Sequence, residues 1–376
     1  MVAFWLNRCY NIGMYIAQVQ LKNYRNYEDL TVELSQGVNV FTGRNAQGKT
    51  NLLEAVYFSS IGRSMRTPRD QELIRWGSER SLIRTISVGR GGRRKVEIIL
   101  DKKEKKSITI GGAKAGKIGE LMGVNMTVLF SPDEIAVIKQ APGDRRRFMD
   151  IAICQLSKAY FYLLNRYNKI LAQRNKLLKN KADGGTLDIW DAQLVSTGAK
   201  VIKTRRGFIA RMNGLVRQNH EFLTSGGESL SLNYESIEGA TEQEIADNFL
   251  SKLRADRERD LINGFTHAGP QTDDFATLIG NIDARKYGSQ GQQRTVALSL
   301  KLAQLDLFYE ETGDYPVLLL DDVFSELDPT RQEKLIEKLS QHQTIITCTH
   351  IEEKFAPYFS SAKIFQVENG TITAQN

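Results

Sequence analysis

The residues with the most explicit chemistry form a phosphate-binding pattern near the start of the chain. Its glycines let backbone N–H groups turn toward the α- and β-phosphates of a nucleotide at a helix N-terminus. Lys49 supplies a positive charge to the β- and γ-phosphates, and Thr50 supplies a hydroxyl to Mg²⁺. We therefore predict a nucleotide site that continues into Asn51. The pattern Gly-x-x-x-x-Gly-Lys-Thr is met by Gly43, Arg44, Asn45, Ala46, Gln47, Gly48, Lys49 and Thr50.

A second group of chemically active residues lies far along the chain. The apolar run of residues 317–320 is predicted to be a central parallel strand, and it ends in Asp321 and Asp322. We expect Asp321 to hold Mg²⁺ through water and Asp322 to polarise the attacking water. Two adjacent carboxylates at a buried strand end repel each other unless a cation is present. The alternative is a solvated turn, but the preceding apolar residues argue against it.

The elements around these residues must place them at one edge of a sheet. Residues 38–41 are predicted to be a buried strand and residues 51–59 the helix that follows the phosphate loop. In a compact domain of this kind the strand before the loop and the acidic strand usually lie side by side. Their long separation along the chain therefore indicates a large insertion between them. With 376 residues and 41% apolar content, the chain is long enough for two domains with cores.

The start of the chain and its cysteines bear on the compartment. Residues 15–21 are predicted to be the first strand, so residues 1–13 are expected to be either a misassigned start, with Met14 the true one, or a frayed extension. They lack the ordered regions of a signal peptide. Cys9, Cys154 and Cys348 form no metal or disulfide pattern, which favours a reducing cytosol. No stretch approaches the roughly 18–20 apolar residues that a membrane-spanning helix needs. We expect a cytoplasmic protein with no membrane partner.

Basic residues are concentrated between Arg90 and Lys117. This window holds ten Lys and Arg against three acidic residues, and its surplus of +7 equals the net charge of the whole chain. Apolar alternation at residues 96–100 and 107–110 predicts antiparallel hairpins with basic turns, which could contact phosphates without recognising bases. A solvated face is the alternative. The candidate DNA-binding residues are Arg93, Arg94, Lys102, Lys103, Lys105 and Lys106, with Arg145, Arg146, Arg147, Arg205 and Arg206 added on helices.

A helical insertion follows the basic window. Residues 144–180 carry one apolar helical stripe and residues 187–215 carry a second. Asp183-Gly184-Gly185 is expected to break the first helix and to form a glycine turn between the two. Apolar steps of three and four are typical of a coiled-coil seam, so we predict two long helices paired as an antiparallel arm. Residues 230–234 alternate like a short strand. A capping box that begins at Thr241 then predicts a third helix through Leu253.

In their order and spacing these segments resemble the RecF family, a compact relative of the SMC and ATP-binding-cassette ATPases. The resemblance implies an α/β fold with a P-loop ATPase head of the ATP-binding-cassette/SMC type, in which helices accompany a mixed sheet. Residues 1–144 and 266–376 are expected to form this head, and residues 145–265 the inserted helical arm. The matching segments are residues 43–50, 62–67, 130–133, 145–150, 289–295 and 319–328.

The same resemblance implies that ATP, with Mg²⁺, is shared between two copies of the chain. A signature run in one copy is expected to contact the γ-phosphate held by Lys49 of the other, and backbone N–H groups from Gln292 onward add a second anion site. Asp328 is expected at that interface. His350 matches a switch histidine that senses γ-phosphate, although a structural histidine is the alternative. The signature residues are Ser289, Gln290, Gly291 and Gln292.

Catalysis is expected to be weak, gated by DNA and carried by Lys49, Asp322 and His350. Many cassette ATPases have Glu where this chain has Asp322, which is one methylene shorter, so hydrolysis is expected to be slow. Two segments depart from the family pattern. Residues 269–274 are Gly-Pro-Gln-Thr-Asp-Asp, without the His and Arg of the family's Gly-Pro-His-Arg-Asp-Asp. The glutamine loop is expected near residues 130–134, where there is no Gln.

By this resemblance the chain is expected to be an ATP-dependent homodimer that recognises gapped DNA or junctions of single-stranded and double-stranded DNA. With RecO and RecR it would load the recombinase in repair, replication restart and the SOS response, as a nucleoid-associated protein without nuclease or helicase activity. One alternative is the ATPase subunit of a membrane transporter, which usually has Leu-Ser-Gly-Gly-Gln where residues 288–292 are Gly-Ser-Gln-Gly-Gln. Another is an ATPase that regulates a nuclease, but too few residues follow His350 for the usual nuclease domain.

Overall fold

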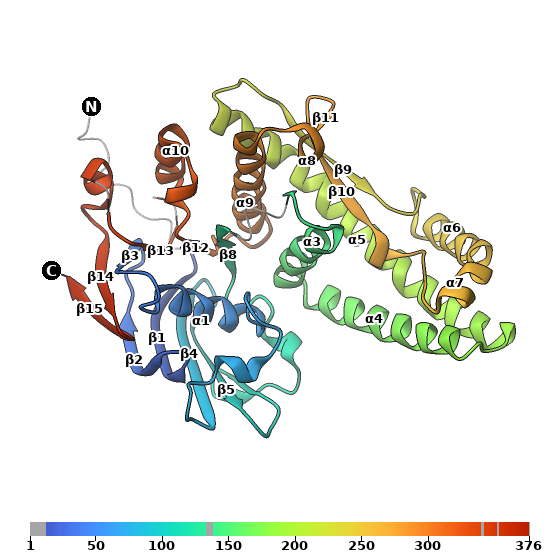
Figure 1. Ribbon diagram of the computed structural model, residues 1–376, viewed down its shortest axis with the longest axis horizontal. Coiled ribbons are helices and arrows are strands. Elements are labelled where there is room, and N and C mark those ends of the chain that lie inside the picture. Colours follow the sequence, from blue (N-terminus) through green and yellow to red (C-terminus); the bar gives the residue numbers. More distant parts are fainter. Residues whose placement is uncertain (1–12, 133–137, 340–341, 352, 376) are drawn as a thin grey trace. The chain divides into compact units, whose positions relative to one another are not determined.

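The computed structural model describes residues 13–132, 138–339, 342–351 and 353–375 (Figure 1). The expectation that residues 1–13 are an extension falls almost entirely outside this range. By their contacts the residues divide into two compact units, one drawn from residues 1–135 and 304–376 and one from residues 136–303. We call them the head unit and the arm unit. The expected limits of the inserted arm, residues 145–265, stay a prediction.

The head unit is built from both ends of the chain, and one of its two sheets carries the phosphate loop. This sheet has the strand order β15-β14-β3-β13-β12-β8, and all neighbours are parallel except β14 and β15. Every residue of β12 is buried, as expected for a parallel strand covered on both faces. The strands are β3 (Val38–Thr42), β8 (Thr127–Phe130), β12 (Val317–Asp321), β13 (Thr344–Cys348), β14 (Lys363–Glu368) and β15 (Thr371–Gln375).

The second sheet of the head unit is antiparallel, with the order β2-β1-β4-β5-β6-β7. It contains the hairpins predicted for the basic window, because β5 pairs with β6 across the turn at residues 102–106. Val96, Ile98 and Leu100 alternate into the buried face of β5. The strands are β1 (Tyr15–Tyr24), β2 (Tyr27–Glu33), β4 (Arg80–Gly89), β5 (Gly92–Asp101), β6 (Ser107–Ile110) and β7 (Ala113–Lys114).

Helix α1 (Lys49–Ile61) begins directly at the phosphate loop and packs against both sheets of the head unit. It contacts β4 and β5 of the antiparallel sheet and β8, β12 and β13 of the parallel sheet. A helix covered on several sides is apolar around most of its circumference. All residues of α1 except Thr50 and Asn51, in its first turn, are buried. The mixed sheets and this buried helix confirm the predicted P-loop head fold.

The strand before the phosphate loop and the acidic strand are not neighbours, so that expectation was wrong. Strand β13 lies between β3 and β12 and pairs with both in parallel. Parallel neighbours need a crossover connection, and helix α10 (Pro329–Leu339) follows β12 and precedes β13 along the chain. The strand after this crossover occupies the central position. The sequence pattern of two strands far apart could not show that a third one separates them.

The arm unit contains helices and a three-stranded antiparallel sheet of order β11-β10-β9. The predicted strand near residues 230–234 and the helix after Thr241 are confirmed, and the Thr241 Oγ1 accepts the Glu244 N–H. No described helix is both long and apolar enough to span a bilayer. The elements are α3 (Pro142–Leu156), α4 (Lys158–Lys179), α5 (Gly184–Thr224), β9 (Leu230–Glu235), α6 (Glu242–Ala255), α7 (Arg257–Asn263), β10 (Asp274–Ile279), β11 (Ile282–Asp283) and α8 (Ala284–Tyr287). Helix α9 (Gln290–Thr312) follows, and its residues from 304 onward belong to the head unit.

Two details of the predicted arm were wrong. The single helix expected over residues 144–180 is interrupted at Ser157, whose backbone is extended and whose hydroxyl accepts the Tyr160 N–H to cap α4. The glycines at 184 and 185 do not form the turn but begin α5, because Asp183 caps that helix by accepting the Thr186 N–H at 2.9 Å. The chain turns just before them, where Lys181 adopts a φ of 52°.

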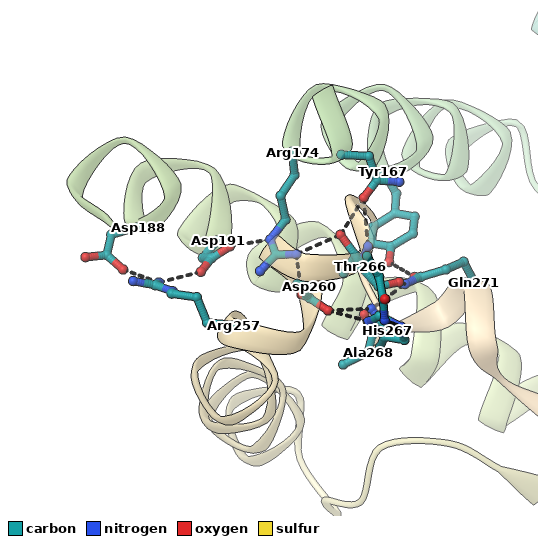
Figure 2. A network of polar contacts seen from close by, with 12 residues as sticks. Tyr167, Arg174, Asp188, Asp191, Arg257, Asp260, Thr266, His267, Ala268 and Gln271 are labelled. Carbon is teal, nitrogen blue, oxygen red and sulfur yellow. Dashed lines mark hydrogen bonds and ion pairs between the residues drawn. The ribbon is translucent and has the colours of Figure 1, made fainter. Parts of the chain in front are cut away.

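A buried ionic network joins α4, α5 and α7 within the arm unit (Figure 2). The Arg174 guanidinium lies 2.6 Å from the Asp191 carboxylate and 2.6 Å from the Asp260 carboxylate, and all three side chains are fully buried. It also donates to Thr266 Oγ1 at 2.7 Å. Arg257 extends the network by pairing with Asp191 at 2.8 Å. The arm is therefore held by a central cation as well as by its apolar stripes.

Replacing Arg174 with Met keeps most of the side-chain volume but leaves two buried carboxylates without their central cation. We expect a loss of about 3–5 kcal/mol of stability, because breaking a buried ion pair exposes the full desolvation cost of the remaining charges. Urea unfolding followed by far-UV circular dichroism measures it. Lys200→Met on the exposed face of α5 is the matched control and should change stability by less than about 0.5 kcal/mol. Equal midpoints for the two variants would contradict the role given to Arg174.

Candidate nucleotide site

The phosphate loop needs its glycines because neighbouring backbone and side chains approach it closely. Gly43 has a φ of 151° and Gly48 a φ of 121°, conformations that L side chains rarely adopt. A Cβ on Gly43 would lie 2.3 Å from the carbonyl oxygen of Val367. A Cβ on Gly48 would lie 2.7 Å from the side-chain nitrogen of Asn26. The two positions therefore exclude any side chain, as the pattern predicted.

The phosphate loop is held in place by hydrogen bonds from residues that the sequence patterns did not identify. Asn26 donates its side-chain N–H to the Gln47 carbonyl at 2.8 Å, and the Tyr27 hydroxyl donates to the Gly48 carbonyl at 2.9 Å. From the other side, the Gly370 N–H donates to the same Gln47 carbonyl at 3.2 Å. The Asn-Gly pair at 369–370 is a hairpin signal between two strands. Nothing in the sequence showed that this hairpin reaches the phosphate loop.

Lys49 lies within the curve of the loop that it follows. Its Nζ donates to the Gly43 carbonyl at 2.5 Å and to the Arg44 carbonyl at 2.9 Å. Burial lowers the pKa of Lys49, while the charges of Asp322 and Asp321 act in the opposite direction. The predicted lysine and both predicted carboxylates are therefore close enough to interact. This places a cationic donor where a triphosphate chain would enter the loop.

The two residues predicted to hold Mg²⁺ meet directly. Thr50 Oγ1 donates to Asp321 Oδ1 at 2.9 Å, and Thr347 Oγ1, from the intervening strand β13, donates to the same oxygen at 2.7 Å. A hydroxyl and a carboxylate oxygen side by side suit Mg²⁺, which prefers oxygen ligands and usually keeps phosphate and water ligands as well. No group of three or more potential metal ligands occurs among the described residues. The donor set therefore fits a cation shared with a nucleotide.

Asp322 lies immediately after β12 in an unusual backbone conformation. Its φ of 53° is rare for a residue with a side chain, and such strain often occurs at functional sites. Its N–H donates to the Thr347 carbonyl at 3.1 Å, which fixes the turn. Cys348, at the end of β13, is half-buried, and burial raises its pKa to about 11. This thiol is therefore protonated at neutral pH, so Asp322 and Asp321 supply the negative charge beside the loop.

The other two residues expected near the nucleotide lie on connections after β12 and β13. His350 is exposed, and its Nδ1 lies 3.1 Å from Thr349 Oγ1. The Asp328 carboxylate accepts the Arg331 N–H at 3.1 Å and also pairs with the Arg331 guanidinium, so it caps helix α10. Burial opposes its ionisation, but these contacts outweigh that effect and lower the pKa of Asp328. The structure thus gives Asp328 a role as a helix cap, and its expected role at a dimer interface stays a prediction.

The signature run opens helix α9 in the arm unit with a reciprocal capping box. Ser289 Oγ accepts the Gln292 N–H at 3.2 Å, and Gln292 Oε1 accepts the Ser289 N–H at 2.9 Å. The Gln292 N–H is therefore bonded to Ser289, and the expected anion site from Gln292 onward stays a prediction. Gly288 precedes the box, and a Cβ there would lie 2.4 Å from the Ala284 carbonyl oxygen. Close packing thus demands glycine just before the signature serine.

Most candidate basic residues of the hairpin turns are exposed. Lys102, Lys103 and Lys105 lie in the turn between β5 and β6, where Glu79 is 3.6 Å from Lys102 and 4.0 Å from Lys103. Arg93 and Arg94 are exposed at the start of β5. Lys106 differs, because its ammonium donates to the Gly62 carbonyl at 2.6 Å and pairs with Asp70 at 2.7 Å. That ammonium is engaged inside the head unit.

Arg145 and Arg205, proposed as DNA contacts from the sequence, are buried, so that expectation was wrong. Arg145 binds both carboxylate oxygens of Asp274 at 2.6 and 2.7 Å. Arg205 pairs with Asp150 at 2.9 Å and donates to the Pro270 carbonyl at 2.6 Å. A run of arginines in a sequence indicates positive charge, but only the fold shows which carboxylates form ion pairs with these arginines.

Arg146 and Arg206 are also engaged within the arm unit, whereas Arg147 is exposed. Arg146 donates to the Asp273 carbonyl at 2.6 Å, and Arg206 to the Ile237 carbonyl at 2.8 Å. Residues 269–274, which differ from the family pattern, also make their contacts within the arm unit. Gln271 donates to the Ala268 carbonyl at 2.9 Å and contacts the Tyr167 hydroxyl. The expected glutamine-loop position, residues 130–134, extends beyond the described residues.

Comparison with known proteins agrees with this geometry. The family model for the RecF/RecN/SMC N terminal domain matches residues 15–373. The DNA replication and repair protein RecF of Clostridium perfringens is 44% identical over 361 residues, which cover 96% of this chain and 99% of that protein. RecF of Halothermothrix orenii is 44% identical over 371 residues, with the same coverage.

Solved structures extend the comparison. The recombination mediator protein RecF of the RecFOR pathway, solved with ATP, has a TM-score of 0.89 and 34% identity, and the match covers 97% of this chain and 98% of that one. The Smc head domain of Pyrococcus furiosus, with a TM-score of 0.57 and 16% identity, shares the fold. The resemblance seen in the sequence is thereby confirmed over nearly the whole chain. This chain belongs to the RecF family of SMC-like ATPases.

Proposed function

We propose that this chain is an ATP-switched DNA-binding protein of replication and repair. The observation that carries the proposal is the contact between Thr50 and Asp321, which brings the phosphate loop and the distant acidic strand together at 2.9 Å. Support comes from relatives named for DNA replication and repair and from a relative solved with ATP. The exposed basic turn at Lys102, Lys103 and Lys105 supplies a surface for phosphates.

In the proposed mechanism each residue of the site has one task. Lys49 turns its ammonium from the loop carbonyls to the β- and γ-phosphates. Thr50 and Asp321 would hold Mg²⁺, which would neutralise charge on the phosphates. Asp322 orients the attacking water and accepts its proton. His350 senses the γ-phosphate from the end of β13. Because the Asp322 side chain is short, its reach to the water is poor and hydrolysis is slow.

The proposed switch needs a second copy of the chain. Ser289 of one copy, with Gln290, Gly291 and Gln292, would contact the γ-phosphate held in the loop of the other, and Asp328 would lie at the same interface. ATP then joins two heads and hydrolysis releases them. DNA gates this weak ATPase because the dimer and the basic turns bind DNA together. No nuclease or helicase step is assigned to the chain.

In the cell we place this dimer in the cytoplasm, on the nucleoid. It recognises gapped DNA or junctions of double-stranded and single-stranded DNA, and with RecR and RecO it promotes loading of the recombinase. The tasks it serves are repair, replication restart and the SOS response. The support for this part is the RecFOR pathway of the ATP-bound relative. A pull-down with RecR on gapped and on intact duplex DNA tests it.

The central experiment measures mass in solution with and without Mg²⁺ and a slowly hydrolysed ATP analogue. Wild-type protein should shift from monomer to dimer. Lys49→Met should lose nucleotide binding and dimerisation together, because the charge that meets the β- and γ-phosphates is gone. Ser289→Arg should still bind nucleotide as a monomer yet fail to dimerise, because the substitution acts on the partner's site. A wild-type protein that stays monomeric in saturating nucleotide and DNA would overturn the proposal.

Asp322→Asn should trap the ATP-bound dimer, because an amide cannot accept the proton of the attacking water. We expect ATP turnover to fall by about 100-fold or more, with nucleotide affinity changed little. Single-turnover hydrolysis and light scattering in ATP measure the two effects. The turnover of Asp247→Asn, which alters an exposed carboxylate on α6 of the arm unit, provides a comparison. Wild-type turnover in Asp322→Asn would remove this residue from the catalytic role.

The triple variant Lys102→Gln, Lys103→Gln and Lys105→Gln removes the positive charge of the exposed turn. It should bind duplex DNA more weakly, and its affinity should depend less on salt concentration. The log–log slope should fall by about 0.9 for each phosphate that the turn no longer neutralises. Lys106 is left unchanged because its ammonium holds Gly62 and Asp70. The control carries the same charge change on the arm, at Lys200, Lys203 and Lys252. Equal slopes in both triple variants would show that only net charge matters.

A further inference from the structure

A chain of hydrogen bonds leads from the signature serine to the buried end of helix α5, entirely within the arm unit. Beyond the Ser289–Gln292 box, Gln292 Nε2 donates to Glu228 Oε1 at 2.7 Å. The second Glu228 oxygen lies 3.2 Å from His220 Nε2. His220 Nδ1 lies 3.0 Å from Ser299 Oγ, two turns further along α9. Neither Glu228 nor His220 belongs to any motif of the sequence.

His220 is held in place by contacts on both of its ring nitrogens. Ser299 Oγ lies 3.0 Å from Nδ1 and itself donates to the Thr295 carbonyl at 2.7 Å. The Glu228 carboxyl group lies 3.2 Å from Nε2. The His220 and Ser299 side chains are fully buried, so His220 anchors Glu228 from inside the arm unit.

Glu228 in turn fixes the orientation of the Gln292 amide. The amide nitrogen must face the carboxylate, and the amide oxygen must face the Ser289 N–H. Without the carboxylate, only the bond from the Ser289 N–H would orient the Gln292 amide. Glu228 lies in the connection between α5 and β9 with about a quarter of its side chain exposed, 28%. It is therefore close to the signature run without being part of it.

The consequence reaches the hydroxyl that the proposed function uses. Ser289 Oγ accepts the Gln292 N–H at 3.2 Å, so its own proton remains to be donated to an anion. A preorganised donor stabilises a phosphate more than one that must be ordered on binding. We infer that Glu228 and His220 are positioning residues for the signature serine, which hold its hydroxyl ready for the γ-phosphate bound by a second copy of the chain.

This role rests on the proposed trans contact of Ser289, and the test must separate the two. Glu228→Ala should leave nucleotide binding by the monomer unchanged, because the phosphate loop contains neither Glu228 nor His220. ATP-dependent dimerisation should weaken by about 10- to 100-fold, the effect of losing one hydrogen bond to a charged group. Glu228→Gln keeps an oxygen for Gln292 and should recover part of the loss. Glu221→Ala, an exposed glutamate beside His220, is the matched control and should behave as wild type.

A double-variant cycle gives the readout that a merely structural role would not produce. If Glu228 acts through the serine, Ser289→Ala combined with Glu228→Ala should dimerise no more weakly than Ser289→Ala alone. Additive losses, or wild-type dimerisation of Glu228→Ala, would overturn the positioning role. Normal dimerisation of Ser289→Ala would instead overturn the trans contact itself. Should Glu228→Ala fail to fold, the same cycle with Glu228→Gln decides by the same criteria.

Discussion

One buried carboxylate oxygen organises the nucleotide site of this protein. Asp321 Oδ1 accepts hydrogen bonds from Thr50, which follows the phosphate loop, and from Thr347 on the strand between. A buried carboxylate without such partners would be costly, so the three segments must come together in this register. The contact fixes the position at which the phosphate loop ends and the position at which a cation can be bound. It also fixes the position of Asp322, the next residue along the chain. The Asn26 and Gly370 contacts then complete the loop from both sides.

In the arm unit, charged side chains form buried ion pairs. Arg145, Arg174 and Arg205 are buried, and each lies against one or two aspartates. Such pairs add specificity to packing because a shifted helix would leave a charge without its partner, although their net contribution to stability is small. The coiled-coil pattern alone would permit neighbouring registers. These three arginines therefore join α3, α4, α5, α7 and β10 within the arm unit.

The signature run shows how a short motif depends on its surroundings. Ser289 and Gln292 cap each other, which any Ser-x-x-Gln at a helix start can do. In this chain the box is tied further to Glu228 and, through it, to the buried His220. These contacts fix the Gln292 amide, and the Gln292 backbone N–H in turn donates to the Ser289 hydroxyl. That link gives the arm unit a direct influence on the residue proposed to meet ATP.

Local spacing along the chain was enough to find the phosphate loop, the acidic strand, the basic hairpins and the cap at Thr241, because each depends on neighbouring residues in the sequence. Only the tertiary structure inserted β13 between β3 and β12, buried Arg145 and Arg205, and brought Asn26 and Gly370 to the loop. These outcomes depend on which distant segments meet. A side chain's charge or hydrogen-bonding capacity is visible in the sequence, whereas the partner that satisfies it is chosen by the fold.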